Sequence, residues 1–409
     1  MSTPLFVAAV GGLALLAGLI SGKLQDWPVS GPMLALLLGI ALGPVGVGAV
    51  DLDSRDARAL LATAAEALLA ISLMGVALRF PYDKVRAVAG PILLLVTLVM
   101  VVMTAVMAAV TGPLLGVAAG HAVLLGAIFA PTDPVLASGV VGGRAERQLP
   151  ERIRVILSVE SGANDGLAMP LVEVGIGLVV AGAMLPGLGR GLTGVLVGLV
   201  VGGALGTATG HLLRRAEQAH HIEQTAFLVL SLALAACAFG TAEAFGGSTL
   251  VAVFIAGMAY GRLVTSEDRH QEADVDEAAN FYLILPLFAL LGACLPWAGW
   301  ARIGWPLVAL AVFVVLVRRL PLVVALARPL GVELRDAVFL GFFGPVGVAA
   351  LAYLADAGER GAVTDDVWAA GTFVIATSTV LYGMTSAYGR RLHVWAARRA
   401  HPTGQARQR

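Results

Sequence analysis

Two polar clusters interrupt an otherwise apolar sequence, and both carry residue types that bind small cations or protons. The first cluster covers residues 130–134 and the second covers residues 160–166. Together they hold three carboxylates, at Asp133, Glu160 and Asp165. Apolar runs long enough to enter a bilayer flank both clusters, and a carboxylate at membrane depth is costly enough to mark a functional site by default.

The first cluster predicts an interrupted helix. Pro131 and Pro134 bracket Thr132 and Asp133. Each proline lacks a backbone donor and disfavours helical backbone in the residue before it. We therefore expect the helix to open at Thr132–Asp133. The freed carbonyl oxygens are tolerated at this depth only beside a protein-lined or water-filled cavity.

The second cluster follows helical spacing. Ser161 and Asp165 lie four residues apart, as do Glu160 and Asn164. Residues at this spacing share a helix face, so two adjacent strips of one helix carry oxygen ligands. With the opened backbone, these side chains predict an oxygen-lined site for a small hard cation or a proton.

The composition places these clusters in a membrane protein. Of 409 residues, 58 % are hydrophobic and only 13 % are charged, whereas a soluble domain has about 25 % charged residues. The 50 glycines suit close helix packing in lipid. The formal net charge is zero, so nothing in the charge argues for a nucleic-acid partner.

Thirteen apolar segments are candidate transmembrane spans, given that one span needs about 20 residues. They cover residues 4–22, 28–50, 58–80, 87–114, 119–143, 151–183, 187–215, 221–245, 248–265, 277–297, 301–329, 334–357 and 364–398. We expect one transmembrane transporter domain over residues 1–398 and a short basic tail over residues 399–409. The first 22 residues have no Lys or Arg, so they predict a retained span rather than a secretory signal.

The distribution of Lys and Arg predicts the orientation. Most of the 27 basic residues fall in the predicted loops on the side of the tail. The C-terminus is therefore expected in the cytoplasm and the N-terminus outside. The acidic stretch 267–277 lies on the cytoplasmic side in this topology. It could attract cations to the mouth of a site, but we interpret it as a solvated loop.

A pseudo-repeat is visible as matching interruptions. The fifth span breaks at residues 131–134, and the twelfth contains Gly344 and Pro345 between further glycines. These spans correspond if residues 1–183 form a first repeat, 187–215 a linker helix and 221–398 an inverted second repeat. Paired interruptions in corresponding spans indicate the substrate site of a transporter. Taken alone, Gly344-Pro345 could equally be a plain kink.

The two clusters also resemble the signatures of the monovalent cation/proton antiporters. Residues 129–136 followed by residues 160–166 are similar to the Na⁺/H⁺ exchanger branch with an Asn-Asp pair. The resemblance covers the whole chain. It implies an all-α homodimer of thirteen-span protomers, each with a dimerisation part and a six-helix core that contains two crossed, discontinuous helices.

The resemblance also implies roles for individual residues. Asp165 would take either the cation or the proton, and Asp133 would assist in the same cavity. Thr132 would offer an oxygen and Ser161 a side-chain ligand. Asn164 stands where electrogenic relatives carry a second aspartate, which implies one-for-one, electroneutral exchange. Glu66, in the third span, matches a glutamate that reaches the ion through water.

One position departs from the commonest family pattern. Many members carry an arginine in the broken twelfth span that pairs with the glutamate matching Glu160, but this chain has Val346 there. This variant resembles the fungal plasma-membrane Na⁺/H⁺ antiporters and their bacterial relatives. A buried unpaired carboxylate is costly, so we expect Arg318 or Arg319 to supply the cation. The alternative is that these arginines anchor the membrane interface by snorkelling.

These observations predict a secondary active antiporter in the bacterial inner membrane that exchanges Na⁺ for H⁺, with Li⁺ as an alternative cation. Its partners would be the transported ions, the lipid bilayer and a second copy of the chain, and no cofactor is expected. The main alternative is a K⁺/H⁺ antiporter of the same fold, because ligand types alone do not separate alkali cations. A cation channel fits the interrupted spans less well. No Ser/His dyad or His-Glu-x-x-His motif lies in the spans, so an enzyme is not expected.

Overall fold

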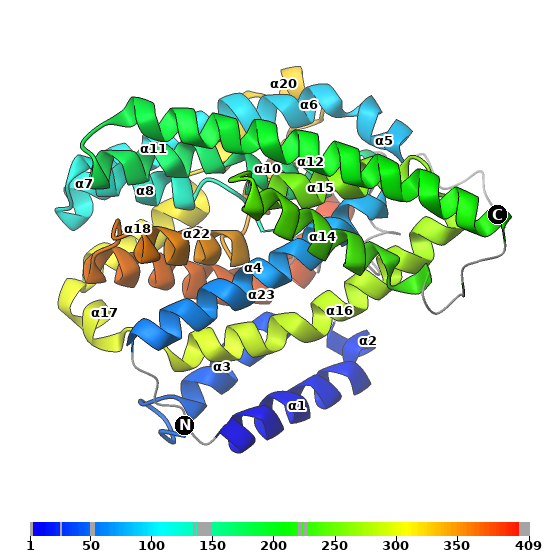
Figure 1. Ribbon diagram of the computed structural model, residues 1–409. Coiled ribbons are helices and arrows are strands. Elements are labelled where there is room, and N and C mark those ends of the chain that lie inside the picture. Colours follow the sequence, from blue (N-terminus) through cyan, green and yellow to red (C-terminus); the bar gives the residue numbers. More distant parts are fainter. Residues whose placement is uncertain are drawn as a thin grey trace.

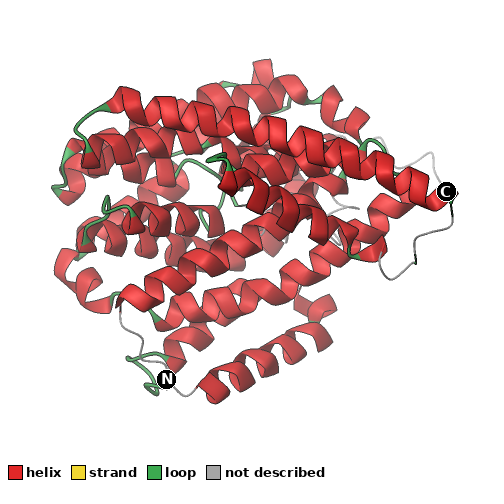
Figure 2. Ribbon diagram, viewed as in Figure 1, coloured by secondary structure: helices red, strands yellow, loops and turns green. Residues whose placement is uncertain are grey.

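The computed structural model describes residues 3–24, 27–49, 54–133, 136, 149–219, 223 and 227–400. Over these residues the protein is all-helical, and none of them forms a strand (Figure 2). This confirms the predicted fold class. Pro134 falls outside the described residues.

Figure 1 shows the arrangement of the helices in the described part of the chain. In chain order they are α1 (Thr3–Leu19), α2 (Ser21–Leu24), α3 (Gly31–Leu42), α4 (Ser54–Arg79), α5 (Tyr82–Ala87), α6 (Ala89–Leu94), the π-helical turn η1 (Leu95–Val99), α7 (Met100–Leu115), α8 (Ala119–Ile128), α10 (Glu151–Leu167), α11 (Met169–Val180), α12 (Met184–Gln218), α14 (Leu230–Ala244), α15 (Thr249–Gly261), α16 (Ser266–Ala293), α17 (Trp297–Ile303), α18 (Trp305–Leu316), α19 (Leu320–Ala325), α20 (Ala327–Leu330), α21 (Leu334–Phe342), α22 (Val348–Glu359) and α23 (Asp365–Ala400).

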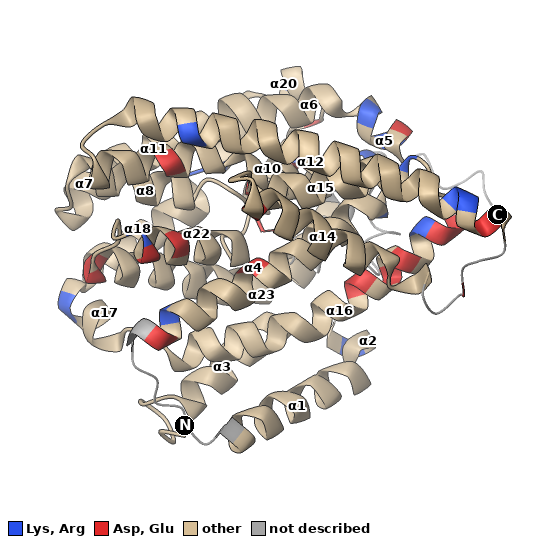
Figure 3. Cartoon of the chain, viewed as in Figure 1, with Lys and Arg blue, Asp and Glu red and all other residues tan. Residues whose placement is uncertain are grey.

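The bundle has the dimensions and polarity of a membrane protein. In the described part of the chain, seven helical segments are long and apolar enough to cross a bilayer, and five shorter apolar helices accompany them. Charged residues gather toward the ends of the helices and leave the middle of the bundle mostly uncharged (Figure 3). The count of thirteen spans stays a prediction.

Both predicted interruptions are present. Helix α8 ends at Ile128, and residues 129–133 are not helical. The chain thus opens a few residues before Thr132–Asp133, where we expected the break. In the second half, α21 ends at Phe342 and α22 begins at Val348, with residues 343–347 extended or irregular between them. In the described part of the chain, the helical backbone is thus lost next to Pro131 and around Gly344-Pro345, as the sequence predicted.

A stripe of glycines sets the position of α12, the long green helix that crosses α15 in Figure 1. The buried glycines of α12 recur every three or four residues, from Gly187 to Gly210. A Cβ atom added at Gly198 would lie 3.0 Å from the Cβ of Val251, on α15. Without side chains on this face, α12 can approach α15 and α11 at backbone distance, which is how helices associate closely in lipid.

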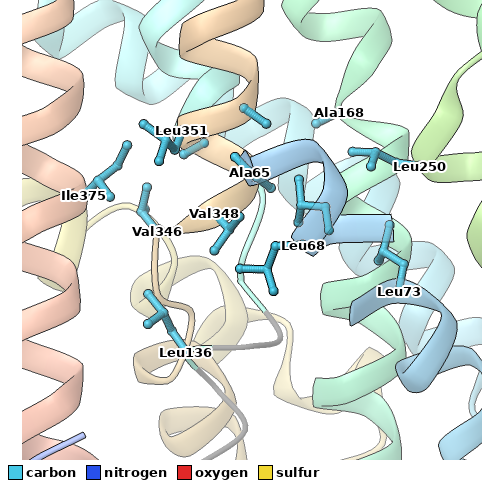
Figure 4. Packing of buried hydrophobic residues seen from close by; sticks show 14 of the residues in the cluster. Ala65, Leu68, Leu73, Leu136, Ala168, Leu250, Val346, Val348, Leu351 and Ile375 are labelled. Atoms are coloured by element: carbon cyan, nitrogen blue, oxygen red, sulfur yellow. The ribbon is translucent and has the colours of Figure 1, made fainter. Parts of the chain in front are cut away.

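Apolar side chains surround the two breaks and exclude water from them. Val346 and Val348, at the second break, are 1 % and 0 % exposed and belong to the main hydrophobic core. Figure 4 shows Val348 beside Ala65 and Leu68 of α4, and Val346 nearer to Leu351 and Ile375. The irregular backbone at the breaks is thus enclosed by protein, as the membrane environment requires.

The interpretation of the acidic stretch 267–277 as a solvated loop is wrong. These residues form the first turns of α16 (Ser266–Ala293), which begins at the N-cap Thr265. Glu272 and Asp276 on this helix are 0 % and 1 % exposed. The acidic residues misled the interpretation because only those on one helix face are solvated, whereas the others point into the bundle.

Candidate functional site

The two broken helices meet at a direct backbone contact. The amide of Asp133 donates a hydrogen bond of 2.9 Å to the carbonyl of Pro345. The Asp133 carboxylate accepts from the amide of Leu136 at 3.0 Å and from the amide of Val348, the first residue of α22. Asp133 therefore places a negative charge at the N-terminus of α22, where the helix dipole favours it.

A closed hydrogen-bond network joins the first break to α10. The Thr132 amide donates to Asn164 Oδ1 at 3.1 Å, and Asn164 Nδ2 donates to Thr132 Oγ1 at 2.9 Å. The Thr132 and Ser161 hydroxyls are 2.8 Å apart. Asn164 Nδ2 also donates to Glu160 Oε1 at 2.9 Å. An aspartate at position 164 could not donate, and its charge would face Glu160.

The two adjacent arginines, which follow α18, have separate partners. Arg319 forms a bidentate ion pair with Glu160, with Nη1 to Oε1 at 2.7 Å and Nη2 to Oε2 at 2.9 Å. Arg318 instead donates to the backbone carbonyls of Phe129, Pro131 and Gly344. Arg319 thus supplies the cationic partner of Glu160, which the valine at position 346 cannot provide. Arg318 satisfies carbonyl groups at both breaks, which otherwise lack helical donors.

Asp165 differs from every other carboxylate of this cluster. It is 0 % exposed, and neither of its carboxylate oxygens has a hydrogen-bond partner among the described residues. Its backbone carbonyl accepts a hydrogen bond from the hydroxyl of Tyr353, on α22. The nearby carboxylates of Asp133 and Glu160 would repel a negative charge on Asp165. A buried carboxylate without donors is costly unless it binds a proton or a cation.

The sequence matches the family model for the transmembrane sodium/hydrogen exchanger over residues 11–387. The chain belongs to the sodium/hydrogen exchanger family. The matched range includes both residues 129–133 and residues 160–166, which hydrogen bonds join in the structure.

Individual relatives share about a quarter to a third of the aligned residues with this chain. It is 33 % identical over 246 residues to Na⁺/H⁺ antiporter 2 of Zygosaccharomyces rouxii. This alignment covers 56 % of this chain and 30 % of that protein. It is 26 % identical over 311 residues to the K⁺/H⁺ antiporter NhaP2 of Shewanella oneidensis, covering 76 % and 51 %. The chain therefore spans about a third to a half of the lengths of these curated relatives.

The fold is also that of a solved structure. The sodium proton antiporter MjNhaP1 from Methanocaldococcus jannaschii superposes with a TM-score of 0.78 at 20 % identity, over 100 % of both chains. At this identity the similarity establishes the shared fold.

The predicted site residues of this family member fall into two groups. Thr132, Asp133, Glu160, Ser161, Asn164 and Asp165 lie together, with Pro131, Gly344, Pro345, Arg318 and Arg319 around them. Glu66 lies on α4 and is half-buried, and the charges that act on it are those of Asp356, Glu243 and Glu359. The structure thus places Glu66 beside a second acidic group, formed by these three residues, rather than beside Asp165.

Two residues of the site were not marked by any motif in the sequence. Tyr353 donates to the Asp165 backbone, and the Ser378 hydroxyl accepts from the amide of Val346 at 2.8 Å. Both are single polar residues within apolar spans, where such residues are common and no motif marks them. Their roles become visible only when α22 and α23 are placed against the breaks.

Gly347 lies where the two broken helices meet, a contact that we call the crossing, and it provides a test of that contact. A Cβ at this position would collide with the Asp133 carboxylate and would lie 2.6 Å from Cδ1 of Leu136. We expect Gly347→Ala to displace Asp133 from the N-terminus of α22 and to lower the exchange rate at least about tenfold. The measurement is ion-driven proton flux in proteoliposomes. Gly358→Ala, where the nearest atom would lie at 3.9 Å, is the matched control and should leave the rate unchanged.

Proposed function

We propose that this protein exchanges Na⁺ for H⁺ across the membrane by competition of the two ions for Asp165. The observation that carries the proposal is the fully buried Asp165 carboxylate, both oxygens of which lack hydrogen-bond donors. Burial favours the protonated form of a carboxylate, whereas a bound cation favours the charged form. One group can therefore hold a proton or a metal ion, and binding of either expels the other.

The oxygen donors around Asp165 suit an alkali cation. We infer that Asp133, Thr132 and Ser161 complete the coordination of the transported ion. All three side chains are buried and come from two segments that meet at the crossing. Hydroxyl and carboxylate oxygens are the ligands that hard cations prefer. Glu66, beside the second acidic group, would contact the ion only through water.

The charge of the site supports a one-for-one exchange. Glu160 is neutralised by Arg319, and Asn164 is neutral. The Asp133 carboxylate accepts hydrogen bonds from the amides of Leu136 and of Val348, at the start of α22. Asp165 is then the residue whose charge changes during the cycle, so one Na⁺ replaces one H⁺. The exchange should be electroneutral.

Transport would follow from alternating access to this fixed site. We propose residues 1–183 and 221–398 as inverted repeats joined by a linker over 187–215. The two broken helices and their surroundings would move as a rigid body against the remaining helices. We further propose a homodimer in the bacterial inner membrane, with the N-terminus outside and the basic residues 399–409 in the cytoplasm.

The function is tested by flux measurements on the purified chain in proteoliposomes. An imposed Na⁺ gradient should drive proton movement, Li⁺ should substitute, and an imposed voltage should change the initial rate less than about twofold, because no net charge moves. Proton flux that follows the voltage and continues without a cation gradient would instead indicate a channel.

The K⁺/H⁺ antiporter is the second candidate, because the relative from Shewanella oneidensis carries that name. Both candidates use the same site, so the cation series separates them. Proton exchange driven by K⁺ at least as well as by Na⁺ would replace the sodium assignment and leave the exchange mechanism intact.

A further inference from the structure

A second polar region lies in a cavity separate from the crossing. The cavity has a volume of about 530 Å³ and is lined by residues of α1, α2, α3, α4, α16 and α23. Its wall includes Ser72 of α4 and Asp276 and Asn280 of α16. None of these residues takes part in the network around Asp165.

The polar residues of α16 form one row. Arg269, Glu272, Asp276 and Asn280 recur every three or four residues, so they share a helix face. Each carries at least one buried polar atom without a hydrogen-bond partner in the described part of the chain. Glu272 is half satisfied, because Oε1 accepts from the Tyr260 hydroxyl at 2.9 Å while Oε2 has no donor.

Asp276 is the residue of this row that points to a ligand. It is 1 % exposed, its Oδ1 accepts from the Ser231 hydroxyl at 3.1 Å, and its Oδ2 has no partner. One turn further along α16, Oδ1 of Asn280 is also without a donor. Both residues line the cavity. Two unsatisfied oxygens on neighbouring turns of one helix are costly unless a cation or water binds them.

We propose that Asp276 and Asn280, with the hydroxyl of Ser72, bind a monovalent cation on its way to Asp165. The inference rests on the proposed function, because it adds an entry site for the same ion. One carboxylate with neutral oxygen donors suits Na⁺ or K⁺, whereas Ca²⁺ sites in proteins gather several carboxylates.

The cavity leads toward the crossing. Its wall includes Leu136, whose amide donates to Asp133, and Val76, which a Cβ at Gly162 of α10 would meet at 3.0 Å. Gly162 is three residues before Asp165. Leu136 and Val76 thus belong both to the cavity wall and to the packing around the central site.

The charges along the wall favour a cation. Three carboxylates line the cavity, at Asp274, Asp276 and Glu277, against the two arginines Arg79 and Arg390. Arg79 is engaged by Glu277 at 3.0 Å. A cavity with an excess of carboxylates raises the local concentration of cations.

Direct binding tests the site without transport. Calorimetric titration of the purified full chain with NaCl should detect residual Na⁺ binding in Asp165→Asn, because the entry site remains. The double variant Asp165→Asn/Asp276→Asn should show none. If the residual binding is absent from Asp165→Asn, or survives unchanged in the double variant, the entry site is refuted.

Transport kinetics test the same site in the working protein. In proteoliposomes, Asp276→Asn should raise the KM for Na⁺ about tenfold while the maximal rate falls less than about twofold, because only ion capture is weakened. Asn280→Ala should raise the KM in the same direction, which covers the possibility that Asp276→Asn fails to fold. Glu267→Gln, at an exposed carboxylate of the same helix that lies outside the cavity wall, is the matched control and should leave the KM unchanged.

The two hypotheses fail in different ways. An unchanged KM in both Asp276→Asn and Asn280→Ala would overturn the entry site and leave the exchange at Asp165 standing. A fall in the maximal rate with no change in KM would assign Asp276 a structural role and would also overturn it. Failure of the wild-type chain to exchange Na⁺ for H⁺ would overturn the proposed function instead, and the binding titration would still report on Asp276.

Discussion

Asp165→Asn is expected to abolish cation/proton exchange, with a rate at least about a hundredfold below that of the wild-type chain. Asparagine preserves the shape of the side chain but can hold neither the negative charge that binds Na⁺ nor the exchangeable proton. The fold should survive, because the Asp165 carboxylate makes no hydrogen bond among the described residues that the substitution could break. The measurement is Na⁺-driven dequenching of a pH-sensitive dye in proteoliposomes, with thermal unfolding in detergent as the test of folding.

A second readout separates loss of the ion site from a general defect. A ligand that binds only the folded state raises the melting temperature as its concentration rises. Most of the stabilisation by Na⁺ should therefore disappear in Asp165→Asn. The control is Asp366→Asn, at an exposed carboxylate paired with Arg302, which should keep both exchange and stabilisation. Exchange at close to the wild-type rate in Asp165→Asn would refute the assignment of the site.

The second large effect is expected at the buried ion pair between Glu160 and Arg319. The two side chains are 1 % and 2 % exposed. Removing one partner of such a pair leaves an uncompensated buried charge and costs about 3–5 kcal/mol. We expect both Glu160→Gln and Arg319→Met to lower the melting temperature strongly. The double variant should recover much of the loss, because it leaves neither charge unpaired.

Arg318 is the control that makes this test specific. It is as buried as Arg319, but its partners are the backbone carbonyls of Phe129, Pro131 and Gly344. Glu160→Gln should therefore not rescue Arg318→Met, whereas it should rescue Arg319→Met. Measured as a double-mutant cycle in thermal unfolding, equal coupling of Glu160 to both arginines would contradict the separate roles that the structure gives them.

The breaks in the fifth and twelfth spans could be predicted because their causes are local. Pro131 and Pro345 each remove a backbone donor locally. Pro113 and Pro286 stay inside the continuous helices α7 and α16, so it was the clustering of Pro131 with Pro134, and of Pro345 with glycines, in corresponding spans that marked the breaks. The spacing of Glu160, Ser161, Asn164 and Asp165 likewise follows from helix geometry alone. The apolar composition then placed these residues in a membrane and made the carboxylates conspicuous.

The partners of these residues depended on the tertiary structure. The sequence offered Arg318 and Arg319 equally to Glu160, and only the packing of the chain after α18 against both breaks directs Arg319 to the carboxylate and Arg318 to the carbonyls. The acidic stretch on α16 was misread for the same reason, because its charge pattern does not reveal which helix face meets α4 and α14.

The sequence by itself determined that this is an all-helical membrane protein with two interrupted spans and a cluster of oxygen ligands. Those properties follow from hydropathy, proline chemistry and helical periodicity, which act over a few residues. The tertiary structure alone decided which buried charges are paired, which leaves Asp165 without donors and Asp276 half satisfied. Pairing depends on side chains that lie far apart in the chain, as in the contact between Glu160 and Arg319, and no local pattern encodes their distance.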